Sequence, residues 1–256
     1  MTQTEKAEAF RALHEGEPFV FPNPWDAGSA RMLEALGFKA LATTSSGFAF
    51  TLGRLDGGAT LDEVVAHTRL LSEASSLPLA IDLENGYGAP GETITRVAEA
   101  GAVGGSIEDY DPAGRLYPLD EAVARLEEAV AAARALDFPF TVTGRAEGQL
   151  RSPDLDDTIA RLQAYETAGA DVLFAPGLRT GDEIRAVTSA VSKPLNVLAR
   201  PGMTMDTIVA AGGQRVSVGG GLTWVAVAAA AQAAERLRDG DLSVLGARVP
   251  LGDWFR

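Results

Sequence analysis

Acidic side chains follow two apolar segments at the point where each segment ends. Asp82 and Glu84 alternate with apolar residues in the stretch IDLEN, and Glu108 ends the run 102–108. Alternate residues of a strand point to one face, so Asp82 and Glu84 are expected to face inward together. Their like charges repel each other, and no lysine or histidine lies near them in the sequence. A hard divalent cation with oxygen ligands is the chemistry these residues predict, and two ordinary acids in a solvated loop are the alternative.

Groups that suit an anion follow two other apolar segments. Arg145 comes directly after the run 138–144, and its planar guanidinium suits a carboxylate or enolate oxygen. Glu147 either orients Arg145 or joins the site, with a plain structural salt bridge as the alternative. The stretch 43–48, TTSSGF, offers hydroxyl and backbone N–H groups to a carboxylate or phosphonate, and a Ser/Thr-rich turn is the other interpretation.

Other polar positions give weaker signals. Asp56 either reaches the water shell of a metal ion or belongs to helix capping near Thr60. Asn196 is expected to face inward, whereas Asp109 is expected to point away from the site. The glycines 219–221 precede the last helix, where barrels often capture phosphate, although close helix packing explains them equally well. Residues 111–118 are predicted to form a loop, either a lid or a surface turn.

Eight short apolar runs alternate with longer amphipathic stretches, and these elements must position the polar side chains. The predicted strands lie in 19–22, 39–45, 77–83, 102–108, 138–144, 171–177, 194–199 and 214–219. Helices lie between them, for example in 119–136, and Gly37, Gly101 and Gly169 are expected as left-handed C-caps. This order predicts an α/β fold, a single (β/α)₈ TIM barrel over residues 1–256. An open Rossmann-like sheet is the alternative, but Asn-Pro-Trp-Asp follows the first run instead of a glycine-rich turn.

Charge and composition exclude several classes of function. The net charge of −13 disfavours binding to nucleic acid or to an anionic membrane. No apolar run approaches the roughly 18 residues of a membrane span and no signal peptide is evident, so a cytoplasmic location is expected. The absence of cysteine excludes thiolate chemistry and disulfides. His14 and His67 are interpreted as surface residues, and Lys39 and Lys193 open strands at the end away from the site.

Several of these segments together resemble the isocitrate lyase/phosphoenolpyruvate mutase superfamily. The resemblance covers residues 22–221 and rests on NPWDAGSARMLEALGFKAL, TTSSGF, GRLD, IDLENGYG, SIEDYDP and GRAE. It implies a barrel fold, a requirement for Mg²⁺ with Mn²⁺ as a substitute, and a small 2-oxo carboxylate as substrate. Members cleave or form a C–C or P–C bond beside that carboxylate, through an enolate held on the metal. They usually form homo-oligomers, and the helix in 224–238 is a candidate for the swapped C-terminal helix of a tetramer or dimer.

The same resemblance implies roles for individual residues. Asp82 would bind the metal directly, with Asp56, Glu84 and Glu108 on its water ligands. Ser46, Gly47, Phe48 and Arg145 would bind the substrate. Thr44 and Asn196 are also expected to bind it, from their positions on the predicted strands. Catalytic roles are predicted for Arg145, Ser46, Glu108 and Tyr110, and Tyr117 or a metal-bound water are alternatives to Tyr110 as the acid or base.

Departures from the family pattern narrow the activity. Glu84 stands where many members have aspartate. The segment DYDPAGRLYP lacks the Cys, Lys and His of isocitrate and methylisocitrate lyases, and it lacks the Lys and Asn of the mutase and phosphonopyruvate hydrolase lids. We therefore predict an enzyme, a Mg²⁺-dependent lyase that cleaves a C–C bond of an oxaloacetate-like 2-oxo acid. A phosphoenolpyruvate phosphonomutase or phosphonopyruvate hydrolase is the second hypothesis, and a non-catalytic metabolite-binding barrel is the third.

Overall fold

The structure, a computed structural model, describes residues 1–246 and 248–255, and each predicted run overlaps one strand of the main sheet. The strands are β1 (Phe19–Phe21), β2 (Leu41–Ala42), β3 (Leu79–Asp82), β4 (Gly104–Glu108), β5 (Tyr110–Asp111), β6 (Arg115–Leu116), β7 (Thr141–Arg145), β8 (Val172–Phe174), β9 (Leu195–Leu198) and β10 (Arg215–Ser217). The helices are α1 (Gln3–Leu13), α2 (Ala27–Ala35), α3 (Ser45–Thr51), α4 (Leu61–Ala74), α5 (Pro90–Glu99), α6 (Leu119–Arg134), α7 (Gly148–Arg151), α8 (Leu155–Thr167), α9 (Gly181–Ala190), α10 (Met205–Ala210), α11 (Gly221–Arg238), the 3₁₀ helix η1 (Leu242–Gly246) and α12 (Leu251–Trp254).

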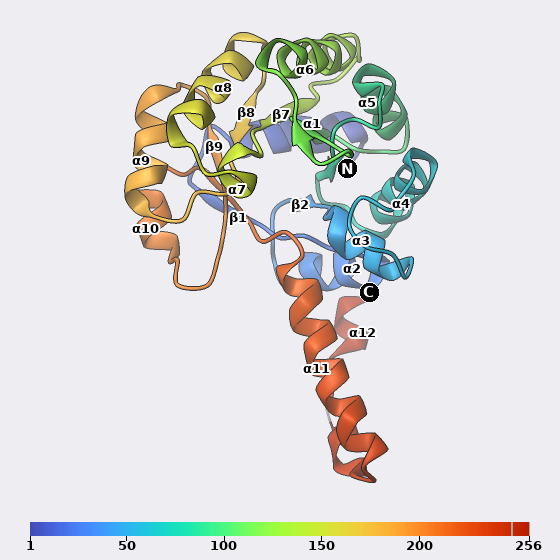
Figure 1. The fold of residues 1–256 in the computed structure, drawn as a ribbon. Coiled ribbons are helices and arrows are strands. Elements are labelled where there is room, and N and C mark those ends of the chain that lie inside the picture. The colour runs from blue at the N-terminus through green and yellow to red at the C-terminus, as the bar shows by residue number, and fades with distance from the viewer. Residues whose placement is uncertain (247, 256) are drawn as a thin grey trace.

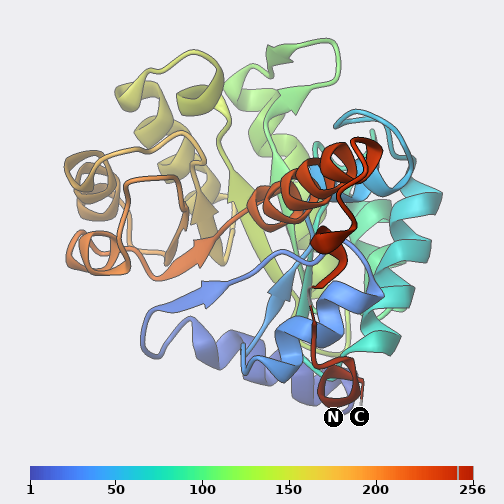
Figure 2. The same ribbon diagram turned by 90° about the horizontal axis from the view of Figure 1, so that it is seen from below.

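The main sheet closes into a barrel. Its eight strands run parallel in the order β1-β10-β9-β8-β7-β4-β3-β2. At the seam between β2 and β1, the N–H of Ala42 donates to the carbonyl of Pro22 at 3.1 Å. Figure 2 shows the strands in the centre with helices around them. The predicted (β/α)₈ barrel is therefore confirmed, while its extent over all of residues 1–256 stays a prediction.

An aromatic cluster packs the amino-terminal end of the barrel. Phe10 of α1 stacks on Phe21, with ring centroids 5.4 Å apart, and Phe19 meets Phe21 edge-on at 6.0 Å. Each buried ring of this kind contributes about 1.5–3 kcal/mol to folding. Because α1 and these rings fill the lower end, the space inside the barrel opens toward the carboxyl ends of the strands.

Left-handed glycines turn the chain from helix to strand, as predicted. Gly37, Gly101 and Gly169 have φ values of 87°, 104° and 95°. A side chain is strained at such angles, so glycine is the natural residue after the last helical turn. These tight turns keep each helix directly beside the strand that follows it.

Residues 111–118, predicted as a loop, include an ordered strand of a hairpin. Strand β5 pairs antiparallel with β6, and Tyr110 lies opposite Leu116. The guanidinium of Arg151 lies over the Tyr110 ring, 4.2 Å from its centroid. This contact ties the hairpin to the short helix α7 at the mouth of the barrel.

Helix α11 leaves the barrel and projects away from it (Figure 1), while the chain returns so that α12 lies against α2. Among its residues, all of which the structure describes, Thr223 alone is buried. Trp224 and Val225 are 45% and 68% exposed. Nowhere in the described part of the chain is a helix both long and apolar enough to cross a bilayer.

Candidate active site

Asp82 and Glu108 end neighbouring strands at the carboxyl end of the barrel, as predicted. The sheet register places Asp82 beside Ser106 and Glu108 beside Arg145. The side chains of Asp82 and Glu108 are 15% and 12% exposed. Two acids this poorly solvated need a positive partner.

Arg145 lies between these acids. Its Nη1 is 3.3 Å from Asp82 Oδ1, its Nη2 is 3.2 Å from Glu108 Oε2, and its Nε donates to Glu147 Oε1 at 2.7 Å. Burial opposes the charge of Arg145, but the three carboxylates outweigh burial and hold its pKa above the ordinary value. No lysine or histidine lies near these acids in the sequence, and their basic neighbour is Arg145, which β7 brings to Asp82 from 63 residues along the chain. The salt bridge to Glu147, which we considered as an alternative, is present as well.

Negative charge still exceeds positive charge around Arg145. Glu84 accepts a hydrogen bond from the Tyr87 hydroxyl at 3.0 Å and forms no ion pair among the described residues. Burial, and then the charge of Asp82, raises the pKa of Glu84 to about 7. Burial and neighbouring carboxylates also raise the pKa of Glu108. This imbalance favours a further cation beside the acids.

The acids fit a metal ion that keeps most of its water. Within residues 1–246 and 248–255, no three acidic or histidine side chains converge closely enough to enclose an ion by themselves. Mg²⁺ commonly takes one or two carboxylates and retains several waters, which agrees with this spacing. Asp82 is held in place by the Ser45 N–H, 3.3 Å from Oδ2. Asp56 lies on an exposed loop nearby, and the ligand roles of these acids remain predictions.

Two adjoining cavities open at this end of the barrel, and Asp56 lines both. The inner cavity has a volume of about 260 Å³ and extends from Asp82 down to Arg215 in the barrel interior. The outer cavity, of about 300 Å³, lies beside Glu84 and Tyr110. Each is large enough for an acid of a few carbon atoms.

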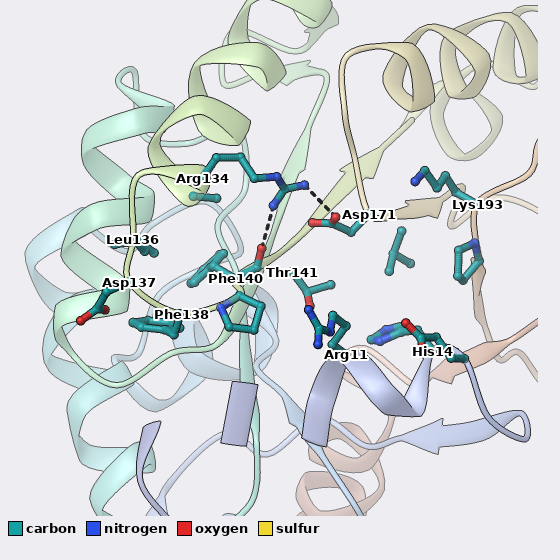
Figure 3. A pocket seen from close by; sticks show the side chains of 15 residues that line it. Arg11, His14, Arg134, Leu136, Asp137, Phe138, Phe140, Thr141, Asp171 and Lys193 are labelled. Atoms are coloured by element: carbon teal, nitrogen blue, oxygen red, sulfur yellow. Dashed lines mark hydrogen bonds and ion pairs between the residues drawn. The ribbon is translucent and has the colours of Figure 1, made fainter. Parts of the chain in front are cut away.

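A larger hollow of about 690 Å³ lies at the opposite end of the barrel, between α1 and the segments that lead into β7, β8 and β9 (Figure 3). Its lining includes Lys193, and Arg134 points across it to Asp171, with 2.7 Å between Nη2 and Oδ1. Active sites of such barrels form at the carboxyl ends of the strands. The clustered acids and Arg145 are also at that end, so we place the candidate site there.

The hydroxyl-rich segment begins a helix. Thr44 caps α3, and its Oγ1 accepts from the Gly47 N–H at 3.3 Å, while the Phe48 N–H donates to the Thr44 carbonyl at 2.9 Å. The N–H groups of Gly47 and Phe48 are therefore engaged within the helix. Thr44 and Ser46 line the inner cavity, with their hydroxyl oxygens 3.1 Å apart. Substrate contact by these four residues remains a prediction.

The remaining predicted residues differ in their surroundings. Asn196 faces the inner cavity, where its Oδ1 accepts a hydrogen bond from Arg215 Nε at 2.8 Å. Tyr110 lines the outer cavity. Tyr117 instead accepts a hydrogen bond from Asn85 at 2.9 Å and lines neither cavity. Tyr110 is thus the better placed of the two tyrosines.

The structure shows what holds Arg145 in place, and it reveals one further residue, Arg215, that sequence analysis missed. The fully buried Glu147 accepts hydrogen bonds from Arg145 and, at 3.0 Å, from Arg151. Its backbone N–H donates to Asp109 at 2.8 Å, so Asp109 is structural, as expected. Arg215 was missed, although a charged residue inside the apolar run 214–219 is itself a signal of an internal polar contact.

His67 is buried and His14 is half-buried, contrary to the expectation that both are surface residues. The ring of His67 stacks on Phe48 at 3.9 Å, and its Nε2 lies 3.1 Å from the Trp25 carbonyl oxygen. Burial lowers the pKa of His67 to about 4 and that of His14 to about 3. The amphipathic pattern missed this because it does not show that α3 packs across α4.

We expect His67 to make the fold less stable in mild acid. Its folded pKa of about 4 lies below the ordinary value of about 6.5, so between these values the unfolded chain binds more protons and is favoured as the pH falls. The loss at pH 5 relative to pH 7.5 is about 2 kcal/mol from this residue. Urea unfolding of wild type and His67→Gln at both pH values measures it, because every other titrating group is shared. Equal losses in the two proteins would show that folded His67 protonates freely.

A (β/α)₈ barrel with acids and a guanidinium gathered at the carboxyl ends of its strands has the architecture of a barrel enzyme that acts on small anions. The chain belongs to the phosphoenolpyruvate phosphomutase family, whose sequence pattern it matches over residues 10–238. It is 34% identical over 216 residues to an oxaloacetate decarboxylase of Paraburkholderia xenovorans, a match that covers 79% of this chain and 71% of that protein.

Solved structures agree with this membership. A candidate lyase/mutase from Burkholderia cenocepacia is 50% identical, with a TM-score of 0.95 and coverage of 99% of this chain and 96% of that one. An oxaloacetate acetylhydrolase in complex with its product oxalate is 27% identical, with a TM-score of 0.89 and coverage of 99% and 93%. A phosphonopyruvate hydrolase with oxalate and Mg²⁺ is 25% identical, with a TM-score of 0.86 and coverage of 98% and 92%. The resemblance to the isocitrate lyase/phosphoenolpyruvate mutase superfamily is confirmed.

Proposed function

We propose that the protein is a Mg²⁺-dependent lyase that cleaves a carbon–carbon bond of a small, oxaloacetate-like 2-oxo acid. The observation that carries this proposal is the acid cluster at the barrel mouth, whose charge Arg145 only partly balances. The oxaloacetate decarboxylase relative and the neighbours that bind oxalate support the choice of substrate class.

The acids and the metal have separable roles in this proposal. Asp82 would hold Mg²⁺ directly, and Asp56, Glu84 and Glu108 would hold its waters; Mn²⁺ suits the same oxygen ligands. When bound, the ion supplies a Lewis acid that polarises the 2-oxo group. A cation at this position would also relieve the repulsion between Glu84 and Asp82.

Arg145 and the groups around it act on the substrate itself. The guanidinium binds a carboxylate or 2-oxo oxygen and stabilises the negative charge that develops as the bond at C3 breaks. Ser46 and Thr44 orient the anionic head, and Asn196 lines the space beyond it. Loss of CO₂ needs no base for a departing hydroxyl, whereas release of a carbonyl fragment does, and Tyr110 is the candidate for that proton transfer.

Phosphorus–carbon chemistry is the alternative activity. The family match and the phosphonopyruvate hydrolase neighbour favour it, but the hairpin segment 110–118 contains neither lysine nor asparagine. Phosphorus NMR of a phosphonopyruvate reaction separates the two activities, because the phosphate ester of phosphoenolpyruvate or free phosphate appears only if the P–C bond breaks.

Mg²⁺ with oxalate is expected to raise the melting temperature of the protein. Oxalate imitates the 2-oxo acid head, and a ligand at 100 times its Kd stabilises the native state by about 2.7 kcal/mol, or roughly 5–10 °C for a chain of this size. Differential scanning fluorimetry with Mg²⁺, with oxalate and with both measures the effect, and EDTA is the control. A melting temperature unchanged by the pair would favour the non-catalytic barrel.

Helix α11 is the proposed contact between copies of this chain. It projects from the barrel and exposes Trp224 and Val225, while Leu242 and Leu245 after it are each 69% exposed. Apolar side chains on an extended arm favour burial against a second subunit. We expect a dimer or tetramer in sedimentation velocity, and a 26.7 kDa species at micromolar concentration would contradict it. The cytoplasmic location also remains a prediction.

A further inference from the structure

Arg215 lies inside the barrel as an internal cation below the acids. It opens β10, and the residue is 4% exposed. Its Nε donates to Asn196 Oδ1 at 2.8 Å and its Nη2 donates to Thr143 Oγ1 at 3.1 Å. Its Nη1 is 3.1 Å from Nε2 of His14, and its Cζ is 4.8 Å from the centroid of the Phe21 ring.

None of these partners carries a negative charge. Asn196 and Thr143 are neutral, and burial together with the nearby Arg215 lowers the pKa of His14 to about 3, so His14 is neutral too. Its Nδ1 lies 2.8 Å from the Phe10 carbonyl and donates there, which leaves Nε2 to accept from Arg215. In the described part of the chain, Arg215 forms no ion pair, whereas Arg145 contacts three carboxylates. A buried guanidinium without a counter-ion is unfavourable unless an anion completes it.

Space and donors for that anion are present. Arg215 lines the same inner cavity as Asp82 and Arg145, and Ala42 and Ala80 leave room in its wall. A guanidinium has five N–H hydrogens, and the contacts above use one on each nitrogen. The remaining hydrogens meet no acceptor among the described residues. Arg215 therefore forms a cationic floor beneath the acid cluster.

The depth of the floor sets the size of the ligand. Thr143, which Arg215 contacts, is two residues before Arg145 on β7, and two residues of a strand span about 6.6 Å. A four- or five-carbon dicarboxylic acid has about 4–5 Å between its carboxyl carbons, given C–C bonds of about 1.5 Å. Such a chain spans most of the depth between the levels of Thr143 and Arg145, whereas the carboxyl group of a two- or three-carbon acid held beside Arg145 does not reach the level of Arg215.

We propose that Arg215 binds the second carboxylate of a four- or five-carbon 2-oxo dicarboxylic acid whose 2-oxo acid head lies beside Asp82 and Arg145. This inference rests on the proposed function and makes it more specific, because it assigns the substrate's second charge to a residue. The proposal also predicts different effects on KM and on kcat. An ion pair with the distal carboxylate stabilises the bound substrate at least as well as the transition state, so its loss should raise KM and leave kcat within about threefold.

Matched pairs of acids test the assignment. Each pair shares the 2-oxo acid head and the carbon chain and differs only in the distal carboxylate: oxaloacetate with 2-oxobutanoate, and 2-oxoglutarate with 2-oxopentanoate. Affinities are measured with Mg²⁺ by calorimetry or as competition against oxalate. We expect the dicarboxylate of at least one pair to bind about 10- to 100-fold more tightly to wild type, as a charged hydrogen-bonded pair provides. Lack of preference in both pairs would overturn the proposal.

Variants locate the preference. Arg215→Gln should lose the preference while its oxalate affinity stays within about threefold of wild type, and Arg215→Lys should keep part of it. Arg185→Gln, an exposed arginine on α9, is the matched control and should keep all of it. A well-folded Arg215→Gln that retains the full preference would show a purely structural role for Arg215. If that variant does not fold, the wild-type ratio and Arg215→Lys still decide, because a lysine variant that keeps none of the preference contradicts the charge-based assignment. If wild type does not bind oxalate in the presence of Mg²⁺, the proposed function itself is refuted.

Discussion

Replacing Arg145 by glutamine is expected to lower kcat/KM for the 2-oxo acid about 10³-fold and to destabilise the fold at the same time. Removal of one preorganised donor to a developing negative charge costs about 10²–10³ in rate, and Arg145 also binds the ground state. Its loss leaves Asp82 and Glu108 without the guanidinium that lies 3.3 and 3.2 Å from them. Breaking a buried ion pair from one side costs about 3–5 kcal/mol. Steady-state kinetics and urea unfolding measure the two effects.

Magnesium and a control variant make this result specific. Because the acids left behind would gain a cation, added Mg²⁺ should restore part of the stability lost in Arg145→Gln. Arg134→Gln removes an arginine of a more exposed pair, to Asp171 at the far end of the barrel, and should cost no more than about 1 kcal/mol with unchanged activity. Near wild-type kcat/KM in Arg145→Gln would remove Arg145 from the proposed mechanism.

Replacing Asp82 by alanine is expected to weaken Mg²⁺ binding by at least about 100-fold and to reduce turnover to a similar degree. Loss of an outer-shell partner typically costs 10- to 100-fold in metal affinity, and a direct ligand should cost more. Glu84 would contact the ion through a water ligand, so Glu84→Gln should lower Mg²⁺ affinity and turnover by only about 10- to 100-fold. Calorimetric titration with Mg²⁺ and a decarboxylation assay at saturating metal measure both quantities.

The stability of Asp82→Ala provides an internal check. Removal of Asp82 relieves its repulsion of Glu84 but leaves Arg145 with one carboxylate fewer, so the metal-free protein should change little in stability compared with Arg145→Gln. Asp171→Ala, an aspartate at the far end of the barrel, is the matched control for Mg²⁺ affinity. An Asp82→Ala protein that keeps both Mg²⁺ affinity and turnover would falsify the metal-site assignment.

The local pattern of the chain was enough to place most of the acids correctly. Asp82 and Glu108 end β3 and β4, where an apolar run meets its last inward position, because the two-residue period of a strand is a property of the backbone. The left-handed glycines were also predictable from the local sequence, because the steric requirements at the end of a helix are local. The hairpin at Tyr110 was not, because its pairing is short and depends on Arg151 from α7.

By itself, the sequence determined the alternation of strands and helices, the strand-end positions of Asp82 and Glu108, and the segments that mark the superfamily. Glu84 was expected to share a strand face with Asp82, but it lies beyond the end of β3 with a φ of 47° and lines the outer cavity. Only the tertiary structure decided which charges meet: Arg145 between Asp82 and Glu108, His67 against Phe48, and Arg215 without an anion in the barrel interior. These contacts join residues far apart in the chain, and strand order and register set them. The periodicity of the sequence determines which way a side chain points, but only the closed barrel determines which partner it contacts.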